Sequence, residues 1–136
     1  MKQIFSLLVL FSLSCYLGAT EKLPLNSGNK ALDNTLLQIN TKYSRKLKQF
    51  SQRISNEYML PQYRLDNMIS NYQFDPADIF LTVEIADLSG QPLDIVSRAY
   101  MENKQQGWRF VLKQLNILSS PAQLKQLKQD AEHYIK

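Results

Sequence analysis

Apolar residues recur at helical spacing in the part of the chain that follows residue 28. Between Asn29 and Met59, eight apolar positions follow one another at steps of three or four residues. The positions are Leu32, Leu36, Ile39, Tyr43, Leu47, Phe50, Ile54 and Tyr58. This spacing puts them on one helical face, so we predict one long amphipathic helix over about residues 29–59. The mean step of about 3.7 residues favours a straight helix packed on its own domain over a coiled-coil dimer.

Five shorter helices are predicted after it. The clearest start is Asp75-Pro76-Ala77-Asp78, because Asp75 can cap a helix, Pro76 suits its first position and Asp78 favours its positive end. The predicted segments cover about residues 65–72, 76–88, 92–104, 108–116 and 121–135. Six helices with short connections predict an all-α fold, a compact bundle whose first helix is long.

One segment also allows a different interpretation. Ile79, Leu81, Val83 and Ile85 alternate with other residues, as they would in a strand. A lone strand would need a partner, and no other segment of the chain offers one. We therefore predict a helix here as well.

The first nineteen residues have the layout of a secretory signal peptide. Lys2 is followed by a short apolar run, and Gly18 and Ala19 form a small-residue cleavage site. The apolar run is about half of the roughly 20 residues needed to cross a bilayer. We therefore predict a signal peptide over 1–19, a flexible lead over 20–28 and a single helical domain over 29–136 in the periplasm or the medium. Lipidation at Cys15, after a poor lipobox, is the alternative, and it would anchor the protein in the envelope.

Charge is distributed unevenly along the chain. Residues 20–60 carry seven Lys or Arg against three Asp or Glu, residues 61–103 carry two against seven, and residues 104–136 carry six against two. Such blocks could pair within the fold. The net charge of +4 by itself indicates little about a partner.

Two short turns resemble a known module. The stretch Ala86–Val96 contains Ser89-Gly90-Gln91-Pro92, and Gly107-Trp108 precedes Leu115-Asn116-Ile117. Over about residues 77–117 the chain resembles small secreted bacterial proteins of unknown function, in which a Ser-Gly-x-Pro turn precedes a helix and a Gly-Trp-Gly turn leads to Leu-Gly-Ile. Arg109 and Asn116 stand where that pattern has glycine. The resemblance implies a helical bacterial envelope protein and brings no activity.

The sequence offers few residues suited to a catalytic or metal-binding site. His133 is the one histidine, near the end of the chain, so a Ser-His-Asp triad and a zinc site are both disfavoured. Asp75 and Asp78 lack the spacing of a calcium loop and are better explained as helix-start residues. We expect no metal, no cofactor and no enzyme activity.

An acid in an apolar segment leaves one enzymatic alternative open. Glu84 lies within the apolar helix predicted over 76–88; if it is buried, its pKa would rise and it could serve a hydrolase as a general acid. The plainer interpretation puts Glu84 and Asp87 on a polar edge of that helix. A concave pocket around Glu84, with a second polar group converging on it, would favour the enzyme.

A helix-turn-helix interpretation is the third possibility. Trp108, Arg109 and Lys113 follow Gly107 and could face nucleic acid, but export and the acidic central segment both disfavour DNA. Trp108 is better explained as an anchor that fills the space between two short helices, although a partner contact at the Trp108 turn stays open. We expect no nucleic-acid partner.

The first predicted helix also carries a basic flank. On one continuous helix, Lys42, Arg45, Lys46 and Arg53 fall within an arc of about 100°. They could contact anionic lipid, an envelope polyanion or an acidic protein, or they could be a solvated face. The working hypothesis is a monomeric, exported, non-enzymatic domain that binds an envelope macromolecule through Lys42, Arg45, Lys46, Arg53, Trp108 and Arg109.

Overall fold

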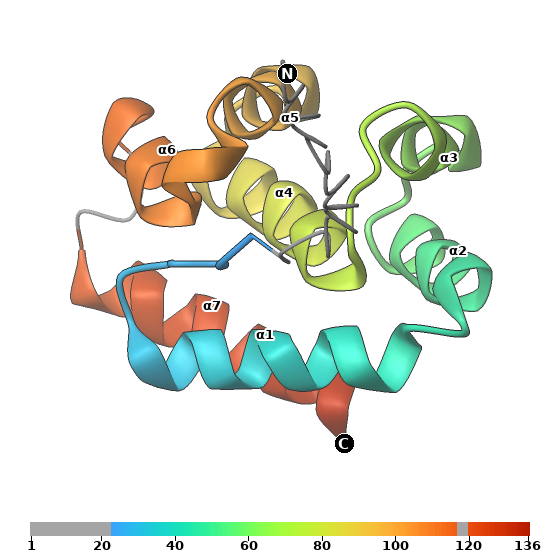
Figure 1. Cartoon of the computed structure of the whole chain (residues 1–136), viewed down its shortest axis with the longest axis horizontal. Helices are drawn as coiled ribbons and strands as arrows, with labels where there is room; N and C mark the ends of the chain where they lie inside the picture. Colours follow the sequence, from blue (N-terminus) through green and yellow to red (C-terminus); the bar gives the residue numbers. More distant parts are fainter. Residues whose placement is uncertain (1–22, 117–119) are drawn as a thin grey trace, which may run out of the picture.

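The fold is all-helical, as the apolar spacing predicts. The structure is a computed structural model that describes residues 23–116 and 120–136, so the predicted signal peptide and Cys15 lie outside the described residues. In the described ranges the chain forms seven α-helices and one 3₁₀ turn (Figure 1). They are α1 Lys30–Tyr43, α2 Leu47–Glu57, α3 Gln62–Ser70, α4 Pro76–Ser89, α5 Leu93–Glu102, η1 Lys104–Gln106, α6 Trp108–Gln114 and α7 Pro121–Ile135.

Helix α4 is the centre of the molecule. It is buried continuously from Pro76 to Ile85, and it packs against α1, α2, α5 and α7. Figure 1 shows α4 in the middle, with α1 and α7 on one side and α5 and α6 on the other. A helix that is covered on all sides is apolar all round, which is why its sequence also resembles a buried strand.

The start signal predicted for α4 is confirmed. Asp75 and Asp78 form a reciprocal capping box, in which the Asp75 N–H donates to Asp78 Oδ2 at 3.2 Å. Pro76 occupies the first turn, and Gly90 ends the helix with a left-handed φ of 70°. These local signals fix where the central helix begins and ends.

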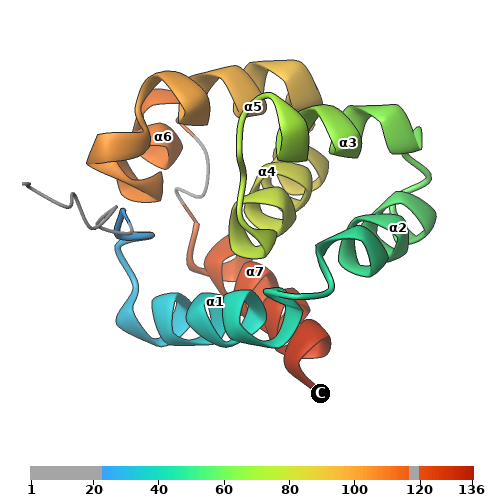
Figure 2. The same ribbon diagram turned by 45° about the vertical axis from the view of Figure 1, so that its right-hand side comes forward.

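The single long first helix is a wrong prediction, because the chain turns between α1 and α2. Lys46 leaves the helical region at φ −129° and ψ 31°, and its N–H donates to the Tyr43 carbonyl at 2.9 Å. A straight helix of about 30 residues would be roughly 45 Å long and would extend beyond a domain of this size. The turn, visible in Figure 2, lets the apolar faces of both helices contact the same core.

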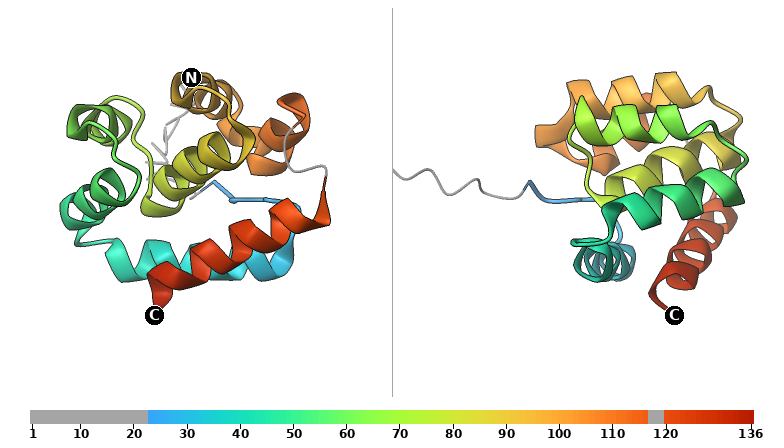
Figure 3. Two further views of the ribbon diagram at one scale, coloured as in Figure 1. Left: turned by 180° about the vertical axis from the view of Figure 1, so that it is seen from behind. Right: turned by 90° about the vertical axis from the view of Figure 1, so that its right-hand side faces the viewer.

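Helix α7 closes the side of the core formed by α1 and α4. Figure 3 shows it running along α1. Tyr134 fixes its end, since its ring makes edge contacts with Phe50 and Phe80 at centroid distances of 5.6 and 5.3 Å. Its carbonyl accepts hydrogen bonds from the Tyr43 hydroxyl and the Lys42 ammonium at 3.1 and 3.0 Å.

None of the helices in residues 23–116 and 120–136 combines the length and the apolar character needed to span a bilayer.

Candidate functional site

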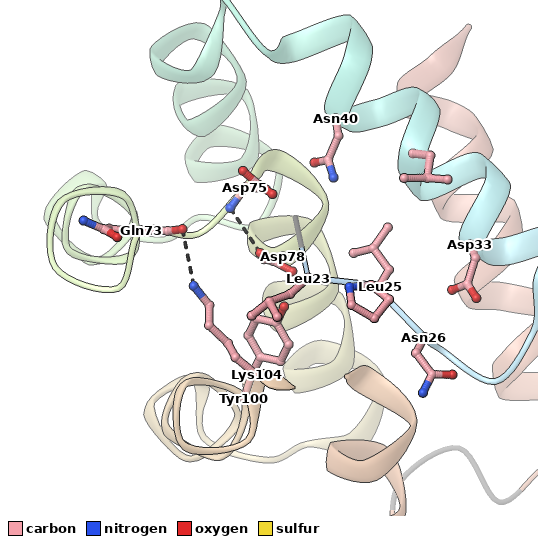
Figure 4. A pocket seen from close by; sticks show the side chains of 12 residues that line it. Leu23, Leu25, Asn26, Asp33, Asn40, Gln73, Asp75, Asp78, Tyr100 and Lys104 are labelled. Carbon is pink, nitrogen blue, oxygen red and sulfur yellow. Dashed lines mark hydrogen bonds between the residues drawn. The ribbon is translucent and has the colours of Figure 1, made fainter. Parts of the chain in front are cut away.

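A hollow of the described fold lies beside the start of α4. We call it the Asp78 pocket; it is bounded by the extended residues 23–26, by α1, by the start of α4, and by Tyr100 and Lys104 (Figure 4). Its volume is about 980 Å³. Pockets that hold small molecules have volumes of about 300–1,000 Å³, so this one is large enough for a ligand.

The extended segment is held against the start of α6. The N–H groups of Trp108 and Arg109 donate to the carbonyls of Leu25 and Asn26 at 2.9 and 2.6 Å. Gly107 has a φ of +76°, and a Cβ atom there would lie 2.7 Å from the Asn26 Cβ atom. Only glycine combines this backbone with so close an approach. The Gly107-Trp108 turn therefore positions one wall of the pocket.

A buried hydrogen-bonded group forms the wall at α4. Trp108 Nε1 donates to Asp78 Oδ1 at 3.1 Å, and the Tyr100 ring stacks on the Trp108 ring at a centroid distance of 4.0 Å. Burial raises the pKa of Asp78, while hydrogen bonds from Tyr100, Trp108 and the Asp75 backbone act in the opposite direction. Trp108 itself is fully buried.

The Asn40 side chain, which lines the pocket, carries a buried hydrogen-bond donor that has no acceptor among the described residues. It is 4 % exposed, and its Oδ1 accepts a hydrogen bond from the Ala77 N–H at 2.8 Å. Its buried Nδ2 has no hydrogen-bond partner among the described residues. Exchanging the amide oxygen and nitrogen would set two donors against each other at Ala77, so the orientation is fixed by the bond. Figure 4 shows the Asn40 side chain reaching from α1 toward the pocket.

The pocket is also acidic. Asp33, Asp75 and Asp78 line it, together with one ammonium group, that of Lys104. Lys104 Nζ donates to the carbonyls of Tyr72 and Gln73 at 3.0 and 3.4 Å, so its charge is held at the Gln73 side (Figure 4). Among the described residues, the lining thus contains three carboxyl groups and one ammonium group.

A second polar cluster surrounds Glu84, where α2, α4 and α7 meet. Glu84 is 3 % exposed; the Tyr58 hydroxyl donates to its Oε2, and Asp130 shares a hydrogen bond with it. Burial, together with Asp130, raises the pKa of Glu84 from its ordinary 4.5 to about 8. The hollow that these groups line has a volume of about 230 Å³. The sequence-based condition for an enzyme, a concave site with a converging polar group, is thus met in geometry, although the hollow is small.

Glu57 sits at the edge of the same cluster. Burial acts to raise its pKa, but hydrogen bonds from Tyr134 and Arg53 outweigh that effect and lower the pKa below its ordinary value. The raised pKa of Glu84 thus favours its protonated form, whereas the lowered pKa of Glu57 favours its ionised form. Hydrogen bonds join Tyr58 to Glu84 and Tyr134 to Glu57 where α2, α4 and α7 meet.

The four residues of the predicted basic flank lie on two helices and in the turn between them, because the unbroken helix that their arc assumed is wrong. Lys42 Nζ donates to the Tyr134 carbonyl, and Arg53 donates to Glu57 Oε1 at 2.8 Å and to the Tyr43 hydroxyl at 3.0 Å. Because the Tyr43 hydroxyl also donates to the Tyr134 carbonyl, Lys42 and Arg53 lie beside the same pair of tyrosines. Arg45 and Lys46 are exposed in the turn between α1 and α2. Partner binding by these four residues stays a prediction.

The proposed Trp108 turn is also arranged differently. Because Trp108 is buried, its ring cannot contact a partner or nucleic acid directly, and the interpretation of Trp108 as an anchor between helices is confirmed. Arg109 is exposed, and its side chain lies along Gly28. His133 is exposed on α7, with Nε2 4.0 Å from Glu57 Oε1. In the described part of the chain no three or more His, Cys, Asp or Glu side chains gather in a group able to hold a metal ion.

Comparisons with known proteins give no relative for this chain. No family model matches it, and neither a similar curated protein nor a similar solved structure was found. The resemblance of residues 77–117 to small secreted proteins therefore stays a prediction.

Sequence reasoning missed the pocket itself. Asn40 was not singled out, although it follows Ile39 in the first apolar pattern, where an amide side chain is unexpected. Asp33, Leu37 and Asn40 lie at steps of four and three, so they share one face of α1. That polar interruption beside the apolar face was the available signal.

Proposed function

We propose that this protein is an exported bacterial envelope domain that acts by binding a ligand in the Asp78 pocket rather than by catalysis. The observation that carries the proposal is the buried Asn40 side chain, which lines the Asp78 pocket and whose Nδ2 has no hydrogen-bond partner among the described residues. A buried donor without an acceptor costs about 1–3 kcal/mol, and a ligand oxygen placed there would recover that free energy. The signal-like N-terminus supports export.

The pocket also has the composition of a binding site. Leu25 and Leu37 supply apolar surface, and a few polar groups converge on the same space from α1 and α4. Ligand sites commonly combine a mostly apolar lining with a small number of placed polar groups. The network of Trp108, Tyr100 and Asp78 makes this wall rigid, so less free energy is lost in ordering it upon binding.

A screen of small fragments by protein NMR tests the binding proposal. We expect some fragments to shift the side-chain resonances of Asn40 and the indole N–H of Trp108 more than those of α2 and α3. If no fragment shifts a pocket resonance, or if the fragments shift only the resonances of exposed residues outside the pocket, the binding proposal is refuted.

The intact mass of the protein recovered from fractionated cells tests export. A chain beginning at Thr20 in the periplasm or the medium supports export, and an uncut cytoplasmic chain contradicts it.

A carboxylate hydrolase centred on Glu84 is the second candidate. The raised pKa of Glu84 beside Asp130 favours it, since a carboxyl group that keeps its proton near neutral pH can act as a general acid. A hollow of about 230 Å³ is below the usual size of a ligand site, which favours the binding proposal instead. Hydrolysis of any compound in a panel of chromogenic glycosides, abolished by Glu84→Gln, would support the enzyme; no turnover of the panel would count against it.

A further inference from the structure

We propose that the ligand of the Asp78 pocket is an uncharged aliphatic compound with a carbonyl oxygen that accepts a hydrogen bond from the Asn40 amide. This inference rests on the proposed function, because it specifies the chemistry of the same pocket. Two features of the lining support it, a buried donor and a group of aliphatic side chains. Neither feature depends on the charge of the carboxyl groups around the pocket.

The donor belongs to the Asn40 side chain, which lines the pocket. Its Oδ1 accepts a hydrogen bond from the Ala77 N–H at 2.8 Å, and its buried Nδ2 has no acceptor among the described residues. The nitrogen is covered, so bulk water does not satisfy it either. A ligand oxygen can accept from this amide, and a ligand N–H cannot.

The burial of the Asn40 amide favours a carbonyl over other ligand oxygens. A hydroxyl brings a donor of its own, which would need a further acceptor at the same buried position. A carboxylate brings a charge, and moving a charge out of water costs more free energy than moving an uncharged oxygen. The carbonyl oxygen of a ketone or an amide has lone pairs, no hydrogen and no charge. It therefore matches a buried neutral donor.

Leu37 lies beside the Asn40 amide on the same helix. It precedes Asn40 by three residues on α1, so both side chains lie on one face of the helix. Leu37 is 50 % exposed and lines the pocket, whereas Asn40 Nδ2 is covered. A change of rotamer at Leu37 can therefore open a path to the amide, and side-chain changes of this size are common on binding.

Aliphatic side chains form another part of the lining. Leu23 is 46 % exposed and, like Leu37, lies on the wall of the pocket, where Leu25 joins them. Removing such apolar surface from water is favourable when an apolar part of a ligand covers it. Figure 4 shows Leu23 and Leu25 crossing the same space that Asn40 and Asp78 approach. An aliphatic chain next to the carbonyl group should therefore strengthen binding.

A matched set of uncharged probes tests this chemistry on the protein expressed from its full sequence. N-butylpyrrolidone carries a carbonyl and an aliphatic chain, N-butylpyrrole has the same chain on a ring of similar size without the oxygen, and N-methylpyrrolidone keeps the carbonyl on a shorter chain. We expect N-butylpyrrolidone to shift the side-chain resonances of Asn40 and Trp108 in an NMR titration. N-butylpyrrole should bind at least about tenfold more weakly, because it leaves the buried donor unsatisfied. N-methylpyrrolidone should bind at least about threefold more weakly, because it covers less apolar surface.

Variants of α1 assign the preference for the carbonyl to Asn40. In Asn40→Ala the donor is absent, so the ratio of the dissociation constants of N-butylpyrrole and N-butylpyrrolidone should fall from at least about ten to about one. Both probes meet the same enlarged pocket in this variant, so the ratio isolates the hydrogen bond from the change in size. Asn34→Ala, at an exposed position of the same helix, is the matched control and should keep the wild-type ratio.

Each outcome separates this inference from the proposed function. The carbonyl is overturned if N-butylpyrrole binds the wild type as tightly as N-butylpyrrolidone, or if a folded Asn40→Ala variant keeps the wild-type ratio. The aliphatic part is overturned if N-methylpyrrolidone binds as tightly as N-butylpyrrolidone. If N-butylpyrrolidone leaves Asn40 and Trp108 unshifted while other fragments shift them, the ligand class is wrong and the pocket still binds. If no compound shifts them, both proposals fail. The comparison of probes on the wild type decides the inference even if Asn40→Ala does not fold.

Discussion

At the scale of single residues, glycine at position 107 decides whether the pocket wall can form. Gly107 and Gly90 both have a left-handed φ, at 76° and 70°. A Cβ atom at Gly107 would lie 2.7 Å from the Asn26 Cβ atom and 3.1 Å from the Leu25 carbonyl oxygen, whereas nothing lies within 4 Å of one at Gly90. Gly90, at ψ 8°, lies in the left-handed helical region, whereas Gly107, at ψ 179°, lies in a region that essentially only glycine adopts. Gly107 therefore exceeds Gly90 both in backbone strain and in the close contact.

Gly107→Ala should lower the free energy of unfolding by about 2–3 kcal/mol, since strain and collision add. Gly90→Ala should cost about 1–2 kcal/mol, from strain alone, and serves as the matched control. Urea unfolding of the two variants measures the difference. Equal losses would mean that the extended segment does not lie against α6 as described.

The residue types along the chain allow the helix starts to be predicted but not the Asp78 pocket. Asp75 and Asp78 were correctly interpreted as helix-start residues, because a capping box is a local signal. The burial of Asp78 against Trp108 depends on where α6 packs, thirty residues further along, and no local spacing determines that. Long-range hydrogen bonds of this kind have no signature in a single sequence.

At the scale of helices, the Glu84 cluster joins α2, α4 and α7. With a pKa of about 8 in the fold and an ordinary value of 4.5, Glu84 keeps a proton that it would release on unfolding. The contribution of Glu84 to the free energy of unfolding should therefore be fully present below pH 4.5 and be lost as the pH rises through 8. Each unit of that pKa difference corresponds to about 1.4 kcal/mol.

Glu84→Gln should flatten this pH dependence, because glutamine keeps the uncharged shape and can still donate to Asp130. Urea unfolding at pH 5, 7 and 9 measures the effect, and the variant should exceed the wild type in stability at pH 9. Asp78, whose pKa is also raised, contributes a slope of the same sign that remains in the variant. Glu102→Gln, at the exposed end of α5, controls for the loss of a carboxylate. A variant with an unchanged slope would contradict the raised pKa of Glu84.

The same scale explains the break between α1 and α2. Apolar residues keep steps of three and four through Tyr43, Leu47 and Phe50, and the rings of Tyr43 and Phe50 contact each other at 4.5 Å across the turn. The apolar spacing thus indicates that the residues before and after the turn pack on the same core. It does not report that the helix axis changes direction there.

At the scale of the whole molecule, the fold follows from a central helix that the rest of the chain covers. The apolar content of α4 and the amphipathic spacing of the helices around it made the all-α class predictable. The pocket arises where four separate parts of the chain meet, which are residues 23–26, α1, residues 73–78 at the start of α4, and Tyr100 with Lys104. Its existence depends on their packing, so it could not be predicted from helical spacing.

The central claim is that the Asn40 amide receives the ligand. Its most direct test is the dissociation constant of the tightest-binding fragment for the wild type, Asn40→Ala and Asn34→Ala, measured by NMR titration. Asn34 is exposed on the same helix and controls for the substitution, and the Trp108 indole resonance shows whether each variant keeps its fold. We expect at least about tenfold weaker binding for Asn40→Ala and an unchanged value for Asn34→Ala. Equal affinity of a folded Asn40→Ala variant and the wild type would contradict the account.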